Sequence, residues 1–220
     1  MELDEADPVP LTELERLDDQ EARRHAVAVD AWLGLRIEDT ERGLPGNLGA
    51  RTGQQLWQHV PVQTMLTPYL ELRALVHALG LASGTVVDLG AGYGRLGFVV
   101  GRYFPGLEFV GYEIVLDRVL EARRALEQFA FPRVRMECAD LASRVMRPCD
   151  ADAYFIYDYG TRDAIEKTLA DLQKVARRRA IAVIGRGRAI RDAIERRHPW
   201  LTEIAPPRHG KNASTYRSRA

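Results

Sequence analysis

The chain has 220 residues, 46% of them hydrophobic and 28% charged, and its 31 basic side chains balance 31 acidic ones. This length accommodates one α/β domain with an N-terminal extension and leaves little room for a second full domain. No apolar run approaches the roughly 20 residues needed to cross a bilayer, and the acidic start does not match a signal peptide, so we expect a cytoplasmic protein with no membrane partner.

Charge is distributed unevenly along the chain. Residues 1–21 contain nine acidic side chains and one arginine, which leaves 30 basic and 22 acidic side chains in the rest. Such a basic excess can attract an acidic protein, a phosphorylated ligand or RNA, but a solvated arginine-rich surface is the simpler explanation. We therefore do not expect a nucleic-acid partner. Cys138 and Cys149 belong to no C-x-x-C pair or His-rich cluster, so we expect free thiols and no metal site.

The N-terminal part is expected to be helical. Apolar side chains recur every three or four residues over 11–35, with Thr12 as the expected N-cap. The glycines and prolines of 40–53 then predict a loop. These features divide the chain into a helical extension with its loop, 1–60, and a main domain, 61–220. A helix over 69–79 opens that domain and ends at Gly80, a favoured C-cap residue.

From residue 85 onward, strand-like and helix-like segments alternate, which predicts an α/β fold with a doubly wound, mostly parallel sheet. The predicted strands are 86–89, 109–112, 134–138, 153–157 and 180–184, followed by a closing pair at 201–204 and 214–217. The predicted helices are 95–104, 117–129, 162–177 and 190–197.

A glycine-rich turn follows the first of these strands. Gly90, Gly92 and Gly94 let the backbone turn sharply and let a ligand approach where a Cβ would clash. Such glycines alone are as compatible with NAD as with other ligands, because in these sheets ligands of either kind bind in the crevice at the carboxyl ends of the strands. Asp88, two residues before the first glycine, favours the ammonium group of an amino-acid ligand and would repel a pyrophosphate.

The segment Asp88-Leu-Gly-Ala-Gly-Tyr-Gly94 resembles the first motif of the class I S-adenosylmethionine-dependent methyltransferases. The resemblance covers residues 85–219 and implies a seven-stranded Rossmann-like sheet whose last strand is antiparallel. It also implies S-adenosylmethionine as cofactor and S-adenosylhomocysteine as product. The cofactor-binding residues implied in this turn are Asp88, Gly90, Ala91, Gly92, Tyr93 and Gly94.

Acidic residues at the ends of the next two strands extend the resemblance. Glu113 stands where the family has the acid that accepts two hydrogen bonds from the ribose hydroxyls, and Ile114 would pack on the adenine ring. Asp140, followed by Leu141, stands where the family reads the adenine amino group. Each acid taken singly is equally well explained as a surface carboxylate at a strand end, but together with the glycine turn they predict a cofactor site.

The fourth strand ends in Tyr157, Asp158 and Tyr159, where the resemblance places residues that face the transferred methyl group. We predict these three as catalytic residues, because methyl transfer needs a positioned, deprotonated nucleophile and Asp158 can accept a proton. Tyrosine rings also attract a sulfonium cation. The alternative role, a core aromatic, is assigned to Tyr154 and Phe155.

Two further segments are candidates for the site. The lid segment 63–69, which includes Thr67 and Tyr69, is predicted to fold over the methionine end of the cofactor. A similar threonine-proline element precedes the core of the seven-stranded protein-lysine methyltransferases. The simpler explanation of Thr67-Pro68 is helix initiation. Arg186 and Arg188, after the fifth strand, either clamp a substrate carboxylate or phosphate, lie at a solvated strand end, or pair with the acidic N-terminus.

Together these features predict methyl transfer to a nitrogen or oxygen nucleophile, on a protein side chain or on a small molecule. The Tyr-Asp-Tyr end of the fourth strand departs from the lysine methyltransferases, so lysine specificity is not implied. One alternative is a regulatory protein that binds the cofactor without catalysis. An NAD-dependent oxidoreductase is disfavoured, because no Tyr-x-x-x-Lys pair accompanies the glycine turn. The sequence does not fix the oligomeric state.

Overall fold

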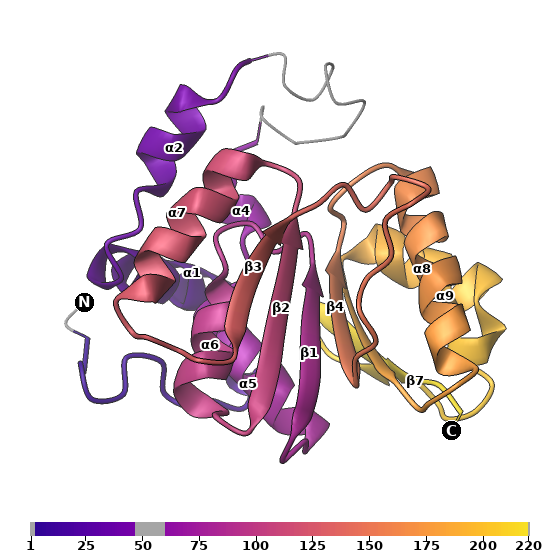
Figure 1. Ribbon diagram of the computed structural model, residues 1–220. Helices are drawn as coiled ribbons and strands as arrows, with labels where there is room; N and C mark the ends of the chain where they lie inside the picture. The colour runs from indigo at the N-terminus through magenta and orange to yellow at the C-terminus, as the bar shows by residue number, and fades with distance from the viewer. Residues whose placement is uncertain (1–2, 47–59, 220) are drawn as a thin grey trace.

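The computed structural model describes residues 3–46 and 60–219, and the α/β prediction is confirmed. A seven-stranded sheet has the order β3-β2-β1-β4-β5-β7-β6 (Figure 1). The strands are β1 (Gly84–Leu89), β2 (Leu107–Glu113), β3 (Val134–Cys138), β4 (Ala153–Tyr157), β5 (Ala182–Arg186), β6 (Arg208–His209) and β7 (Ala213–Arg217). Strands β1 to β5 pair in parallel, whereas β7 is antiparallel to both β5 and β6.

The order of the strands reverses next to β1. Leu89, at the end of β1, lies opposite Tyr112 of β2 on one side and opposite Ile156 of β4 on the other. The loops that leave β1 and β4 therefore run to opposite faces of the sheet, and a crevice forms beyond the carboxyl ends of the strands. The glycine turn and the Tyr-Asp-Tyr segment both open onto this crevice.

Helices cover both faces of the sheet (Figure 1). One face carries α1 (Asp19–Trp32), α5 (Tyr69–Leu79), α6 (Arg95–Tyr103) and α7 (Leu116–Glu127), and the other carries α8 (Arg162–Ala176) and α9 (Arg188–Arg197). Because side chains alternate along a strand, Val86 packs in the core under the first group with Phe98, whereas its neighbour Val87 packs under the second group with Leu169.

The N-terminal extension is less continuous than predicted. A short 3-10 helix covers Leu14–Arg16, and α1 begins only at Asp19, because the Asp18 carboxylate caps it by accepting a hydrogen bond from the Glu21 N–H at 2.8 Å. The predicted cap, Thr12, is wrong, and its hydroxyl donates to the Pro10 carbonyl instead. A further helix, α2 (Ile37–Gly43), occupies the start of the predicted loop, and residues 47–53 of that loop lie outside the described residues.

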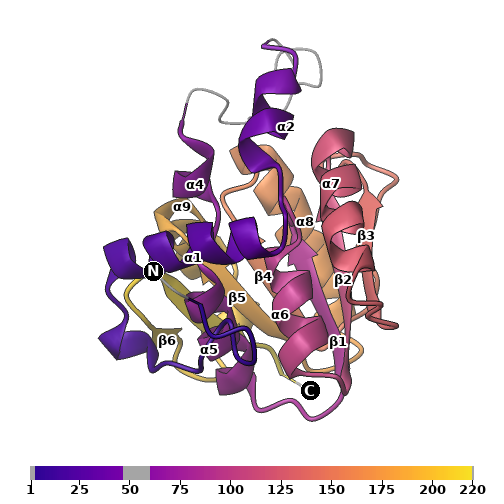
Figure 2. The same ribbon diagram turned by 90° about the vertical axis from the view of Figure 1, so that its left-hand side faces the viewer.

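The extension packs on the main domain and shares its core. Figure 2 shows α1 lying across α5 and α6. The Trp32 ring of α1 meets the Phe98 ring of α6 edge to face, with 6.0 Å between centroids, and Val29 is fully buried in the same core. The short helix α4 (Val62–Met65) follows residue 60 and leads into α5. The predicted boundary at residue 60 therefore does not separate two hydrophobic cores.

One predicted strand is wrong. Residues 201–204 do not pair with β7; Pro199–Leu201 forms a 3-10 turn that buries Leu201, and β7 pairs instead with the two-residue strand β6. The apolar character of this segment reflects one buried side chain in a turn that a proline begins, not an alternating strand. The described helices include none with the length and apolar character that spanning a membrane requires.

Candidate functional site

The turn after β1 needs its glycines. Gly90, Gly92 and Gly94 all have positive φ, at 93°, 53° and 72°. A Cβ on Gly90 would lie 2.4 Å from the Cβ of Tyr159, which is closer than real side chains approach. The N–H groups of Gly90 and Ala91 both donate to the Tyr112 carbonyl, at 2.9 and 2.8 Å, so the turn is fixed against β2. This backbone leaves space beside the turn for a ligand.

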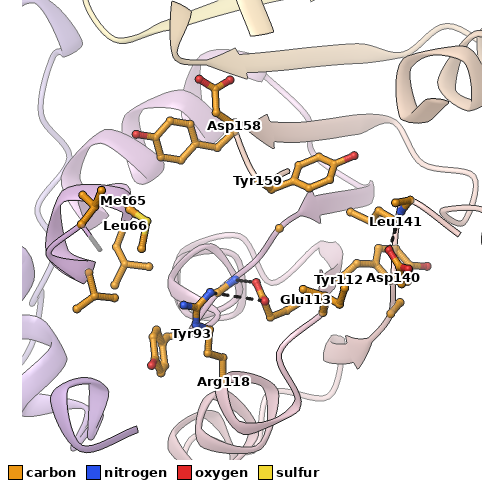
Figure 3. Close-up of a pocket in the computed structure, with 18 of the residues that line it drawn as sticks. Met65, Leu66, Tyr93, Tyr112, Glu113, Arg118, Asp140, Leu141, Asp158 and Tyr159 are labelled. Carbon is orange, nitrogen blue, oxygen red and sulfur yellow. Dashed lines mark hydrogen bonds and ion pairs between the residues drawn. The ribbon is translucent and has the colours of Figure 1, made fainter. Parts of the chain in front are cut away.

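A cavity of about 310 Å³ lies beside this turn. Its volume is within the range of small-molecule sites, about 300–1,000 Å³. Figure 3 shows Met65 and Leu66 on one side of the cavity and Asp140 and Leu141 on the other. The lining residues are Val60, Val62, Thr64, Met65, Leu66, Gly90, Gly92, Tyr93, Tyr112, Glu113, Ile114, Arg118, Ala139, Asp140, Leu141, Ala142, Tyr157, Asp158 and Tyr159.

Glu113, the last residue of β2, is held in the cavity wall by two backbone N–H groups. One carboxylate oxygen accepts the N–H of Gly92 and the other accepts the N–H of Val115, both at 3.0 Å. The side chain is buried, and the nearest cation is the Nη1 of Arg118 at 3.8 Å. A carboxylate has about four lone-pair sites, so two remain for a ligand. Glu113 therefore both fixes the glycine turn and can accept two hydroxyl groups.

Asp140 lies beyond the end of β3, at the far side of the cavity from Leu66 (Figure 3). Its Oδ1 accepts the N–H of Ala142 at 2.9 Å, which holds the start of the following loop. Ile114 and Leu141 line the same part of the cavity, and Leu141 is buried. An apolar slot with one carboxylate at its edge suits a flat heterocycle that carries an amino group.

Asp88 lies on the other side of the turn. It lines a smaller adjoining cavity of about 60 Å³ together with Thr67, Gly90 and Arg95. Burial raises the pKa of the Asp88 carboxyl to about 7, and the nearby charge of Glu113 adds to the effect. A ligand ammonium group next to Asp88 would lower that pKa again, because an adjacent positive charge favours the ionised carboxylate.

The three residues at the end of β4 have different surroundings. Tyr157 lines both cavities, and its ring lies 4.9 Å from the Arg186 guanidinium. Asp158 points away from the centre of the main cavity (Figure 3), and its Oδ1 accepts the Ile190 N–H at 3.1 Å, in the first turn of α9. Burial raises the pKa of the Asp158 carboxyl. The geometry thus gives Asp158 a helix-capping contact in addition to its place in the cavity wall.

The Tyr159 hydroxyl is directed away from the cavity, toward α8. It lies 2.5 Å from the Thr168 hydroxyl and 3.3 Å from the Ala164 carbonyl. The ring lines the cavity and fills the space that a Cβ on Gly90 would need. The prediction that Tyr159 contributes to catalysis is therefore limited to its ring, because its hydroxyl bonds to the protein.

Four other candidate residues are placed by the structure. Tyr69 lies outside the cavities: it is fully buried, and its hydroxyl donates to Asp30 at 2.7 Å, so the prediction that it contacts a cofactor is not supported by its position. Thr67 lines the smaller cavity. Arg186 is held by Glu71 through contacts of 2.9 and 3.2 Å. Arg188 is 91% exposed in its side chain, 3.8 Å from Asp192.

Some residues around the cavity, among them Val62 and Arg118, were not predicted from the sequence, whereas Met65 and Leu66 belong to the predicted lid. Val62, Met65 and Leu66 cover it from α4 and the following residue, and Arg118 lines it from α7. The sequence does indicate this cover, because Met65 and Leu66 lie within the predicted lid segment 63–69 and Val62 lies next to it. Arg118 gave no signal, because an arginine on an amphipathic helix ordinarily faces solvent. Within the described ranges, no group of three His, Cys, Asp or Glu side chains is arranged to hold a metal ion.

Comparisons with known proteins give similarity in structure alone. No protein-family model matches the chain, and no curated protein matches it in sequence. TrmN from Thermus thermophilus aligns with 70% of this chain at 15% identity and a TM-score of 0.49, and this chain spans 49% of TrmN. A SAM-dependent methyltransferase from Aquifex aeolicus aligns with 67% of this chain and 88% of its own, at 14% identity and a TM-score of 0.49.

A TehB-like SAM-dependent methyltransferase from Corynebacterium glutamicum aligns with 67% of this chain and 85% of its own, at 16% identity and a TM-score of 0.46. The strand order β3-β2-β1-β4-β5-β7-β6, with β7 antiparallel, agrees with the sheet that the glycine motif implies. The chain therefore has the seven-stranded, Rossmann-like fold with an antiparallel β7 that the sequence resemblance implies.

Proposed function

We propose that the chain is an S-adenosylmethionine-dependent methyltransferase that acts on a nitrogen or oxygen nucleophile. The observation that carries the proposal is the Glu113 carboxylate, which uses two lone-pair sites on backbone N–H groups and leaves two for a ribose diol. Asp88 stands on the other side of the glycine turn, where a cationic amino group offsets its burial. A diol acceptor and an ammonium acceptor on either side of one turn fit a nucleoside joined to an amino acid.

Bound S-adenosylmethionine would supply the electrophilic methyl group, and the protein would position the acceptor against it. Tyr157 is the best-placed residue for this task, because it lines both cavities and hence the region between the sugar and the amino-acid group. Its aromatic ring would also stabilise the cationic sulfur. Asp158 would accept or hold a proton, at the edge of the cavity.

The cover over the cavity supports a small-molecule acceptor more than a protein side chain. Met65 and Leu66 reach over the site from the N-terminal side, and Leu66 comes within 3.2 Å of a Cβ placed on Gly92. A protein substrate would need an open groove leading to Asp158. Arg188 is the better candidate of the two predicted arginines for binding an acidic acceptor, because Arg186 is already paired with Glu71.

Calorimetry with S-adenosylhomocysteine tests the cofactor assignment. Glu113→Ala should weaken binding by about 1–3 kcal/mol, because the ribose diol loses a charged acceptor. Glu108→Ala is the matched control, because Glu108 belongs to the same strand and is exposed. Equal affinity in the two variants would remove the assignment. Incubation with labelled cofactor and a cell lysate would then show whether label reaches protein, RNA or a small molecule.

A second candidate function is cofactor binding without methyl transfer, as in a regulatory protein. The observation in its favour is that two of the three predicted catalytic groups have structural contacts: Asp158 caps α9, and the Tyr159 hydroxyl bonds to Thr168. Asp158→Asn separates the two functions. An enzyme should bind cofactor normally and turn over more slowly in this variant, whereas a regulatory protein should show no transfer to any lysate fraction before or after the change.

A further inference from the structure

The N-terminal extension reaches the ribose-binding side of the cavity through one carboxylate. Glu41, in α2, holds the Arg118 guanidinium side-on, with Nε at 2.7 Å and Nη2 at 3.0 Å from its two oxygens. The same carboxylate accepts the Tyr93 hydroxyl at 2.7 Å. Tyr93 belongs to the glycine turn and Arg118 to α7, so Glu41 connects the extension to both.

Arg118 lies between two acids that serve different purposes. Its third nitrogen, Nη1, is 3.8 Å from Glu113, beyond hydrogen-bond distance, and the three side chains are only 6–17% exposed. Figure 3 shows Arg118 directly beside Glu113 at the cavity wall. A buried guanidinium is stable only when a carboxylate pairs with it, and Glu41 provides that pair in the favoured bidentate geometry.

Without Glu41, Glu113 is the carboxylate next to the buried guanidinium. A rotation of the Arg118 side chain would then close the 3.8 Å gap and place N–H donors on the lone pairs of Glu113 that face the cavity. Those lone pairs are the ones that the proposed function assigns to the ribose hydroxyls. Arg118 and the diol would therefore compete for the same acceptor.

We propose that Glu41 is a positioning residue for the cofactor: it holds Arg118 away from Glu113 and so keeps Glu113 available to the ribose. This inference rests on the proposed function, because it requires that Glu113 bind a diol. It makes the N-terminal extension part of the cofactor site, although Glu41 itself does not line the cavity.

The test compares the dissociation constants of S-adenosylhomocysteine and its 2′-deoxy analogue, measured by calorimetry. The wild-type protein should prefer the ligand with the complete diol by about tenfold, the effect of one hydrogen bond to a charged group. Glu41→Gln should remove most of that preference. If Glu41 had a merely structural role, Glu41→Gln would weaken the binding of both ligands by the same factor and leave the preference intact.

Rescue decides the mechanism. The double variant Glu41→Gln with Arg118→Gln should regain the preference for the diol, because the competing guanidinium is gone. Asp39→Asn is the control, because Asp39 lies on the same helix and pairs with Arg42 in solvent, at 70% and 74% exposure. Denaturant midpoints of all variants identify any that are unfolded. If Glu41→Gln is unfolded, Glu41→Asp, which retains the charge, replaces it and should lose only part of the preference.

The two proposals fail in different ways. If the wild-type protein binds neither ligand, the proposed function is wrong and this inference fails with it. If the wild-type protein prefers the diol and Glu41→Gln retains that preference, or if the double variant does not regain it, the cofactor site stands and the role of Glu41 is wrong.

Discussion

The guanidinium of Arg95, the residue directly after the glycine turn, forms a buried ion pair with Asp30 of the N-terminal helix α1. Its Nε lies 3.0 Å from Asp30 Oδ1, its Nη2 contacts Asp30 Oδ2, and the two side chains are 4% and 6% exposed. Arg95 also donates to the Gln63 side chain at 2.7 Å and to the Thr67 carbonyl at 3.3 Å. One side chain thus joins α1, the lid segment and the glycine turn.

Asp30→Asn should therefore destabilise the whole protein. Removing one partner of a buried ion pair leaves an uncompensated charge, which costs about 3–5 kcal/mol in the free energy of unfolding. Urea unfolding followed by circular dichroism measures this change. Asp39→Asn, which breaks an exposed pair with Arg42, should cost less than about 1 kcal/mol. Similar losses in the two variants would mean that the Asp30 pair contributes no more than a surface contact.

The same pairing explains why the sheet could be predicted from the sequence and the contacts of the extension could not. The central strand 153–157 contains its own signal, because burial on both faces requires continuous apolar residues, whereas the edge strand 134–138 alternates apolar and charged residues. Asp88 and Glu113 could be identified in the same way, because each stands at the end of an apolar strand, β1 or β2. Asp30 and Arg95 are 65 residues apart, and nothing local marks either as a partner of the other.

The ion pairs between the acidic N-terminus and the basic remainder of the chain were also not predictable from local sequence. The sequence allows arginines of the main domain to pair with the acidic N-terminus. Asp7 contacts Arg73 at 2.6 Å and Asp19 contacts Lys211 at 3.2 Å, so part of the basic excess is compensated internally. Arg186, at the end of β5, is likewise compensated within the chain, because it pairs with the Glu71 carboxylate of α5. The sequence gives the number of charges, but which charges form ion pairs depends on the three-dimensional fold.

Gly90→Ala should abolish cofactor binding. The new methyl group would overlap the Cβ of Tyr159 at 2.4 Å, and φ of 93° is unfavourable for any residue with a side chain, so the turn must move away from the cavity. Gly80→Ala is the matched control, because Gly80 has φ of 69° and no atom within 4 Å of the added Cβ. It should cost only about 1–2 kcal/mol of stability for the left-handed conformation and keep normal affinity. Calorimetry with S-adenosylhomocysteine compares the two, and unchanged binding by Gly90→Ala would show that the turn does not contact the ligand.

Tyr159→Phe should affect stability more than activity. The hydroxyl contacts Thr168 and Ala164 of α8, and its loss removes a largely buried hydrogen bond worth about 0.5–1.5 kcal/mol. The ring, which lines the cavity, remains. Denaturant unfolding and the rate of methyl transfer are both measured, with Tyr157→Phe for comparison. A large loss of rate with unchanged stability would show that the Tyr159 hydroxyl takes part in the reaction after all.

Asp88 should make both stability and binding depend on pH. Its pKa is raised to about 7 from an ordinary value of 3.8, so the native state binds a proton that the unfolded state releases between these values. The free energy of unfolding should therefore fall as the pH rises from about 4 to about 7, and Asp88→Asn should lose this part of the dependence.

Cofactor binding should show the opposite trend. The ligand ammonium favours ionised Asp88, so affinity for S-adenosylhomocysteine should rise as the pH approaches and passes about 7. Below that pH, binding should release a proton, which calorimetry detects when the same titration is run in two buffers with different ionisation enthalpies. Asp88→Asn should bind with no such release. Proton release that persists in the variant would assign the titrating group elsewhere, and the ammonium would then have to be bound by a different part of the site.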